Sequence, residues 1–192
     1  MKSTTTGITK LLYPWVQTIS IKGIINDIKL IPIFYKINDF RDKNKKGHIQ
    51  INYIDDIPIV ISAEPNPIND TRRKKVPSTL LKNSIDPVTS IISLGILSIN
   101  GCNNLIPIFD GRRRFDLEYK TAESKEESLL CNLKIKRIAG YSKKELRKHP
   151  KEGTIKLKIL PGSNSFFFPT EVKIPLTIGS FYVKLNANLV LQ

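Results

Sequence analysis

The stretch that decides the fold spans residues 86–100 and reads DPVTSIISLGILSIN. It opens with Asp86-Pro87, a typical helix start in which aspartate caps free backbone N–H groups and proline occupies the first turn. Asn100, followed by Gly101, suits the left-handed conformation in which many helices end. The apolar residues between these ends recur at helical spacing: Val88, Ile91, Ile92, Ile96 and Ile99. The pattern predicts one helix from Asp86 to Asn100 with a single apolar stripe.

Outside this segment the dominant period is two, which is the spacing of a half-buried strand. The clearest alternation of apolar and polar residues lies at 49–53, 115–119, 155–159 and 181–191. Weaker strand signals lie at 15–21, 29–37, 57–64, 130–138 and 166–173. Turn residues are expected to separate the strands at Lys22-Gly23, 161–164 and 178–180. Many alternating strands with one polar face favour an antiparallel sheet over a parallel one.

A lone amphipathic helix can bury its stripe only against this sheet. The sequence therefore predicts an all-β fold with one helix, in which a strongly curved antiparallel sheet, or half-barrel, wraps around that central helix. All 192 residues are expected to form a single domain. The polar stretches 65–83 and 141–153 are expected to be loops, the second with one helical turn at 142–147.

Composition limits the classes of function. Hydrophobic residues make up 40% of the chain, which supplies a real core and excludes a disordered chain. Lysine and arginine number 31 against 17 acidic residues, and the formal net charge of +14 permits an anionic partner without proving one. The longest apolar stretch, residues 88–99, is too short and too interrupted to span a membrane. The first residues lack the pattern of a secretory signal.

The two cysteines, Cys102 and Cys131, are too far apart in sequence for the paired spacing of a zinc site. Two histidines do not complete a Cys/His metal site, so no metal and no cofactor is expected. The cysteines are either free thiols of a cytosolic protein or one disulfide of an exported protein. Cys131 shares strand parity with Leu133 and Ile135, so a bond would attach the end of the helix to the inner face of a strand.

The densest charged cluster spans residues 109–116. Strand parity places Arg113 on the apolar face, where a buried guanidinium requires a carboxylate partner. Asp110 and Asp86 are the candidate partners. The cluster could clamp an anion through its guanidinium groups, but we favour an internal ion pair that fixes the helix against the sheet. The candidate structural or anion-binding residues are Asp86, Asp110, Arg112, Arg113, Arg114 and Asp116.

Two basic runs form a candidate polyanion-binding patch: Arg72, Arg73, Lys74 and Lys75, and Lys143, Lys144, Arg147 and Lys148. Nucleic acid is not the expected partner, because no aromatic residues punctuate a basic strand face and no recognition helix or finger motif is present. The simpler interpretation is that both basic runs are solvated loops without an anionic partner. An anionic membrane surface is the stronger functional alternative.

Catalysis has little support in the sequence, and we expect no enzyme and no catalytic residues. Neither His48 nor His149 lies in a nucleophile motif, and no phosphate-binding glycine loop occurs. The adjacent carboxylates Asp55 and Asp56 precede a proline and are read as turn residues.

Three stretches together carry a family resemblance: residues 85–90, Cys102 followed by residues 106–117, and Cys131 leading to residues 138–141. Their order, an Asp-Pro helix, a cysteine, Phe-Asp-Gly-Arg-Arg and a second cysteine, resembles the exported proteobacterial family called domain of unknown function 3108, in its alphaproteobacterial form. Thr6-Gly7 and the closing strand after Thr177 are similar as well. The family has no settled activity.

The resemblance implies a periplasmic protein, an oxidising compartment and therefore a Cys102–Cys131 disulfide. Relatives carry a signal peptide and at least one strand before the position of Gly7, and this chain is expected to lack both. We therefore predict a non-catalytic periplasmic protein of the cell envelope that binds an apolar or amphiphilic ligand or a partner protein. The alternative is a basic protein that binds polyanions or an anionic membrane surface.

Overall fold

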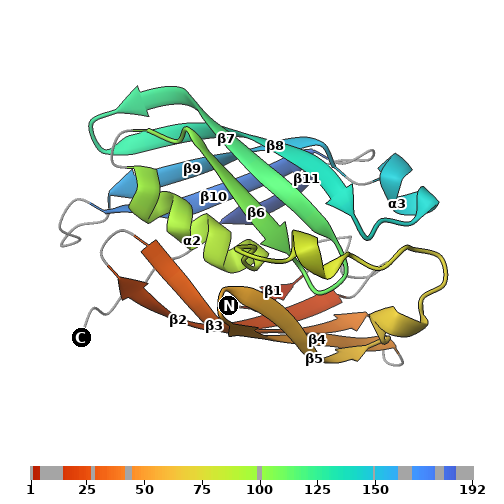
Figure 1. Ribbon diagram of the computed structural model, residues 1–192. Coiled ribbons are helices and arrows are strands. Elements are labelled where there is room, and N and C mark those ends of the chain that lie inside the picture. The colour runs from red at the N-terminus through yellow and green to blue at the C-terminus, as the bar shows by residue number, and fades with distance from the viewer. Residues whose placement is uncertain are drawn as a thin grey trace.

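The computed structural model describes residues 2–4, 15–26, 29–41, 45–98, 101–148, 150–159, 166–175 and 180–184. Several predicted features lie outside these residues: Thr6-Gly7, the helix end at Asn100, His149, the turn at 161–164, most of the turn at 178–180, and the last strand beyond Lys184. Two antiparallel sheets form two layers, and a helix lies between them (Figure 1).

The first sheet has five strands in chain order: β1 (Lys2–Thr4), β2 (Trp15–Asn26), β3 (Lys29–Arg41), β4 (Lys45–Ile54) and β5 (Ile57–Glu64). Each strand pairs with the next in the chain, so β5 lies at one edge. Alternate residues turn inward and bury Ile19, Tyr35 and Ile51 on one face.

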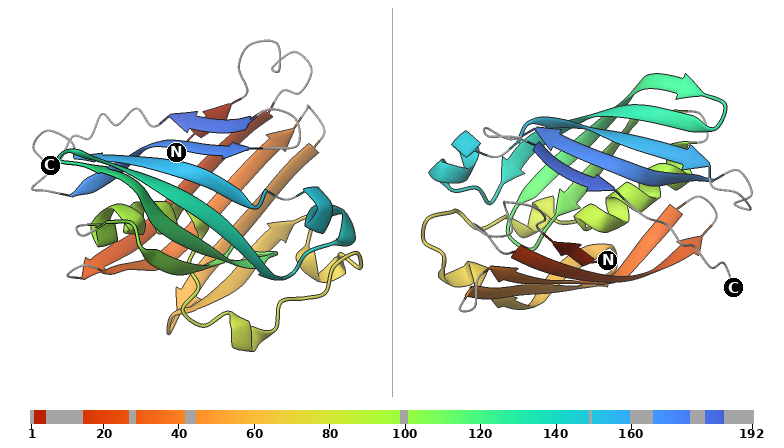
Figure 2. Two further views of the ribbon diagram at one scale, coloured as in Figure 1. Left: turned by 90° about the horizontal axis from the view of Figure 1, so that it is seen from above. Right: turned by 180° about the vertical axis from the view of Figure 1, so that it is seen from behind.

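The second sheet has six strands in the spatial order β11, β10, β9, β8, β7, β6. Their bounds are β6 Asn104–Phe109, β7 Arg114–Lys125, β8 Ser128–Ala139, β9 Glu152–Ile159, β10 Phe167–Pro175 and β11 Ser180–Lys184. Seen from above, its strands run in a clearly different direction from those of the first sheet (Figure 2). Its inner face buries Leu117, Leu133, Ile155 and Leu157.

Helix α2 (Pro87–Leu97) contacts both sheets, through β3 on one side and through β6 and β10 on the other. Gly95 makes this fit possible, because a Cβ atom there would lie 2.0 Å from the carbonyl oxygen of Phe167. The residues that α2 buries are mostly small: Thr89, Ser90, Ser93, Leu94, Gly95 and Ile96. The predicted helix is therefore present, but its predicted single apolar stripe is wrong, because a helix between two sheets needs close approach on two sides.

Three further expectations are corrected. The strands do not form one curved sheet around a single helix, because they divide into two sheets. The helical turn predicted at 142–147 is present as the short helix α3 (Lys143–Lys148). Lys22-Gly23 is a bulge inside β2 rather than a turn. No strand was predicted at Asn104–Phe109, where the structure has β6; its Pro107 is tolerated because β6 is an edge strand.

Two short 3-10 helices, Pro67–Asn69 and Ser78–Leu80, lie in the connection from β5 to α2. A parallel bridge between Ile85 and Ile108 then joins this connection to β6. The connection thus crosses from the first sheet to the second along the open side of β5. This crossing brings residues that are distant in the sequence to one end of the molecule.

Candidate functional site

The two cysteines form a disulfide with a Cα–Cα distance of 5.8 Å, and both are fully buried. The backbone N–H of Cys102 donates to the hydroxyl of Thr121 at 2.9 Å, which fixes the segment that follows α2 against β7. Gly101 precedes it with a φ of 103°, a conformation that favours glycine. The disulfide implied by the family resemblance is confirmed.

Arg113 lies in a tight turn between β6 and β7 and pairs with Asp110. The Oδ2 atom of Asp110 accepts from Arg113 Nε at 2.8 Å, and its Oδ1 atom accepts from the backbone N–H groups of Arg112 at 3.0 Å and Arg113 at 2.7 Å. Gly111 within the turn has a φ of 88°, and a Cβ there would meet the side chain of Ile49 at 2.5 Å. The turn therefore rests directly on the first sheet.

Asp86 does not pair with an arginine. Its Oδ1 atom accepts from the N–H groups of Val88 at 3.0 Å and Thr89 at 2.8 Å, so it caps α2. The hydroxyl of Tyr53 donates to Oδ2 at 3.5 Å from the first sheet. Burial raises the pKa of Asp86, and burial together with the Asp86 charge raises the pKa values of Tyr53 and Tyr35. Asp86 thus couples the helix start to the first sheet.

Arg114 and Asp116 bind each other on β7. The guanidinium of Arg114 also donates to the carbonyl oxygen of Leu80 at 3.0 Å and to that of Phe115 at 2.7 Å. These contacts attach the second 3-10 helix to the second sheet. Arg114 and Asp116 therefore have a structural role.

The two basic runs lie side by side, because Arg73 forms an antiparallel bridge with Ser142 just before α3 (Figure 1). Asp70 accepts hydrogen bonds from Arg72 Nε at 2.7 Å and Arg73 Nε at 2.8 Å. The hydrogen bonds from Arg72 hold the pKa of Asp70 well below its usual range. Part of the predicted cationic patch is therefore neutralised within the fold.

Glu145 joins this network from α3. Its Oε2 atom accepts from the N–H of Ser142 at 2.9 Å and from the Ser142 hydroxyl at 2.8 Å. The N–H of Glu145 donates in return to the Ser142 Oγ at 3.3 Å, and the two reciprocal backbone bonds form a capping box at the start of α3. Its Oε1 atom lies 3.3 Å from Arg73 Nη1 and 3.8 Å from Arg113 Nη1. Burial alone would raise the pKa of Glu145, but the Ser142 hydrogen bonds and the two arginines hold it below its ordinary value.

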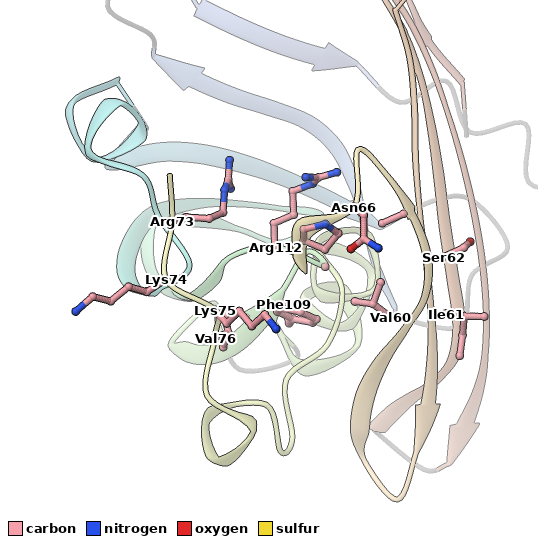
Figure 3. Close-up of a pocket in the computed structure, with 13 residues that line it drawn as sticks. Val60, Ile61, Ser62, Asn66, Arg73, Lys74, Lys75, Val76, Phe109 and Arg112 are labelled. Carbon is pink, nitrogen blue, oxygen red and sulfur yellow. The ribbon is translucent and has the colours of Figure 1, made fainter. Parts of the chain in front are cut away.

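A pocket of about 270 Å³ lies between β5 and this network (Figure 3). Its apolar wall includes Val60, Val76 and Phe109, and Lys75 and Arg112 contribute positive charge. The lining residues are Val60, Ile61, Ser62, Ala63, Asn66, Pro67, Arg73, Lys74, Lys75, Val76, Phe109, Gly111 and Arg112. No carboxylate and no histidine is among these residues. The sequence identified the cations of this pocket as candidate binding residues, but it did not predict that they share a pocket with β5.

Arg112 is the half-buried cation of this pocket. Its Nη2 donates to the carbonyl oxygen of Pro65, just beyond β5. Burial, reinforced by the positive charge of Arg73, lowers the pKa of Arg112. Asp110 and Asp70 offset only part of this cost, so an anion that enters the pocket would further stabilise the Arg112 cation. The pocket can therefore hold a carboxylate or phosphate beside an apolar group.

A larger and shallower hollow of about 850 Å³ lies on the outer face of the second sheet. Its lining includes four lysines and two glutamates, and Glu118 lies 2.9 Å from Lys136 Nζ and 3.9 Å from Lys120 Nζ. This face has the mixed charge of an ordinary solvated surface. Within the described ranges, no cluster of three or more potential metal ligands occurs, and no helix is long and apolar enough to cross a membrane.

The fold and the pocket together define a class: a protein of two antiparallel sheets and an intervening helix, with a cationic pocket beside an edge strand. The chain belongs to the family described as Protein of unknown function (DUF3108), whose family model matches residues 1–186. No curated protein and no solved structure matches the chain.

Proposed function

We propose that this protein is a non-catalytic binding protein of the bacterial periplasm that holds an anionic, partly apolar ligand in the pocket beside β5. The observation that carries the proposal is the pairing of an apolar wall, formed by Val60, Val76 and Phe109, with the cations Lys75 and Arg112. An amphiphile with a carboxylate or phosphate end satisfies both parts. Guanidinium groups bind such oxyanions with two parallel hydrogen bonds.

The proposed compartment is supported by the disulfide, because such bonds persist in oxidising compartments and are rare in the cytosol. The resemblance to an exported family points the same way. Cell fractionation followed by thiol alkylation under denaturing, non-reducing conditions tests it. We expect the protein in the periplasmic fraction with no free thiol, and a cytosolic protein with two alkylated cysteines would contradict the proposal.

The proposed lack of catalysis is supported by the arrangement of the titratable groups. The pocket is lined by cations, whereas Asp110 and Arg113 bind each other outside it. A general base near a reacting group would be needed for most hydrolytic chemistry. The lining residues include no histidine and no carboxylate, the groups that most often serve as general bases.

Decanoate, a ten-carbon carboxylate, is a suitable probe for the pocket. We expect it to raise the melting temperature of the wild-type protein, by about 5–10 °C at a concentration of roughly 100 times Kd. Replacement of both cations, Lys75→Ala and Arg112→Ala, should weaken binding by about ten-fold or more, because each removes a charged contact.

Lys158→Ala is the matched control, since Lys158 is an exposed lysine on β9, away from the pocket lining. It should leave decanoate binding unchanged. The proposal fails if decanoate and decyl phosphate do not bind the wild type, or if Lys158→Ala weakens binding as much as the pocket variants do.

A second candidate function is binding to polyanions or to an anionic membrane surface. The Arg73–Ser142 bridge favours it, because it joins the exposed lysines Lys74 and Lys75 to the lysines of α3. Binding to heparin and to phosphatidylglycerol vesicles should then weaken steeply as salt is raised. Lys143→Ala with Lys144→Ala should reduce that binding and leave decanoate binding intact, and a flat salt response would remove this candidate.

A further inference from the structure

We infer that the natural occupant of the pocket is the C-terminal end of an extended polypeptide, which pairs with β5 as an added strand and places its terminal carboxylate beside Arg112. This inference rests on the proposed function and specifies its ligand. It follows from four features: the open edge of β5, the way the pocket meets that edge, the position of the cations, and the size of the pocket.

β5 is an edge strand of its sheet, and the pocket separates residues 60–63 from the connection that passes along its open side. It is the last strand of its sheet, so one side of its backbone lacks a strand partner among the described residues. Residues 57–63 contain no charged side chain, and only Pro58 interrupts their hydrogen-bonding capacity. Ile57, Ile59 and Ile61 are 36%, 41% and 54% exposed. Edge strands normally carry charges that prevent pairing, so this one is suited to accept another strand.

The pocket meets β5 along its edge rather than on one face. Four consecutive residues, 60–63, line it. Successive side chains of a strand point to opposite faces, so consecutive residues share a pocket only where the pocket borders the strand backbone. Figure 3 shows Val60 directed toward the pocket and Ile61 directed away from it. An extended chain in the pocket would therefore lie within reach of the backbone groups of β5.

Arg112 marks one end of this groove. Arg112 donates to the carbonyl oxygen of Pro65, which places its guanidinium at the C-terminal end of β5. Lys75 points toward the pocket from the opposite wall (Figure 3). Arg73 is already engaged by Asp70 and Glu145. A terminal carboxylate bound to Arg112 would make the added strand run parallel to β5.

The size of the pocket favours a chain end over a whole small molecule. Its volume of about 270 Å³ lies just below the range of roughly 300–1,000 Å³ that is usual for small-molecule sites. Beyond the pocket the edge of β5 extends to Ile57, where a longer peptide would meet backbone groups and exposed isoleucines. Backbone hydrogen bonds then supply affinity, and the carboxylate fixes the register.

The test uses synthetic peptides of eight residues that alternate threonine and valine. One peptide ends in a free carboxylate, and its matched control ends in an amide. Two further free-acid peptides are N-methylated at alternate residues, one at the odd and one at the even positions. Binding is measured by fluorescence anisotropy, and hydrogen exchange of the β5 amides is followed with and without the free acid.

We expect the free acid to bind, and the amide to bind about ten-fold or more weakly because it lacks the charged contact. Only one N-methylated peptide should lose affinity, because alternate residues of a strand face the same partner. The amides of β5 should exchange more slowly in the complex. Arg112→Ala should reduce the preference for the free acid over the amide, whereas Lys158→Ala should not.

The results separate this inference from the proposed function. If decanoate binds and the peptides do not, the anionic pocket stands and the inference is overturned. Equal binding of acid and amide, equal binding of the two N-methylated peptides, or unchanged exchange in β5 would also overturn it. If neither decanoate nor any peptide binds, both the proposed function and the inference fail.

Discussion

The disulfide between Cys102 and Cys131 should contribute a large share of the stability of this protein. It closes a loop with a sequence separation of 29. The loss of chain entropy in the unfolded state then corresponds to ~3.6 kcal/mol at 25 °C for a loop of this length. For a domain of this size, that value predicts a fall in melting temperature of about 7–14 °C when the bond is absent.

The cleanest comparison is between oxidised wild-type protein and the same protein unfolded, reduced and refolded in a reductant, because only the bond differs. The double variant Cys102→Ala, Cys131→Ala adds the loss of two buried sulfur atoms and should be less stable still. Calorimetry gives the melting temperature, and urea denaturation gives the free energy of unfolding.

Burial of both sulfur atoms adds a kinetic expectation. A reductant added to the folded protein should break the bond only as fast as the protein opens locally. The reasoning is refuted if reduced and oxidised wild type melt within about 2 °C of each other, because the loop would then not restrict the unfolded chain.

Three further predictions concern single residues. Gly95→Ala should lower the free energy of unfolding in urea by about 3 kcal/mol or more, since its Cβ would lie 2.0 Å from the backbone of Phe167. The control Ser93→Ala should be neutral or stabilising, because the buried Ser93 hydroxyl has no hydrogen-bond partner among the described residues. Burial raises the pKa of Asp86 above 3.8, so the native state holds this proton more tightly than the unfolded state, and the contribution of Asp86 to stability should fall as pH rises from about 4. In melts between pH 4 and 7 the stability of Asp86→Asn relative to wild type should therefore increase with pH, and a difference that does not depend on pH would contradict the assignment. Glu145→Ala removes the carboxylate of the capping box of α3 and its contact with Arg73, and should lower the free energy of unfolding in urea by about 1 kcal/mol. A decrease below about 0.3 kcal/mol would show that α3 does not depend on this carboxylate.

Local features of the fold could be predicted from the sequence. The Asp-Pro start of α2 and the period-two alternation of β4, β7 and β9 depend on neighbouring residues, and the structure shows each of them. The requirement for a carboxylate near Arg113 is also a local inference, because Asp110 lies three residues away. Such features can be predicted without knowing which strands pair.

The division into two sheets could not be predicted in this way. Alternation shows which side chains of a strand face inward, but it does not identify the neighbouring strand. The pocket was missed for the same reason, since it depends on contacts between β5, Arg73 and Arg112 across long stretches of sequence. The uncharged run at residues 57–63 was the one available signal, because such a run is unusual for an exposed edge.

The position of α2 has a consequence for how the molecule can be divided. Val88 packs with the first sheet and Leu94 lies in the core of the second, so a single helix serves both. A fragment that ends at residue 64 would keep its strands but leave Tyr35 and Ile51 facing water. Expressed fragments, engineered cleavage sites and fusions should therefore keep both sheets and α2 in one chain, because neither sheet can cover its inner face alone.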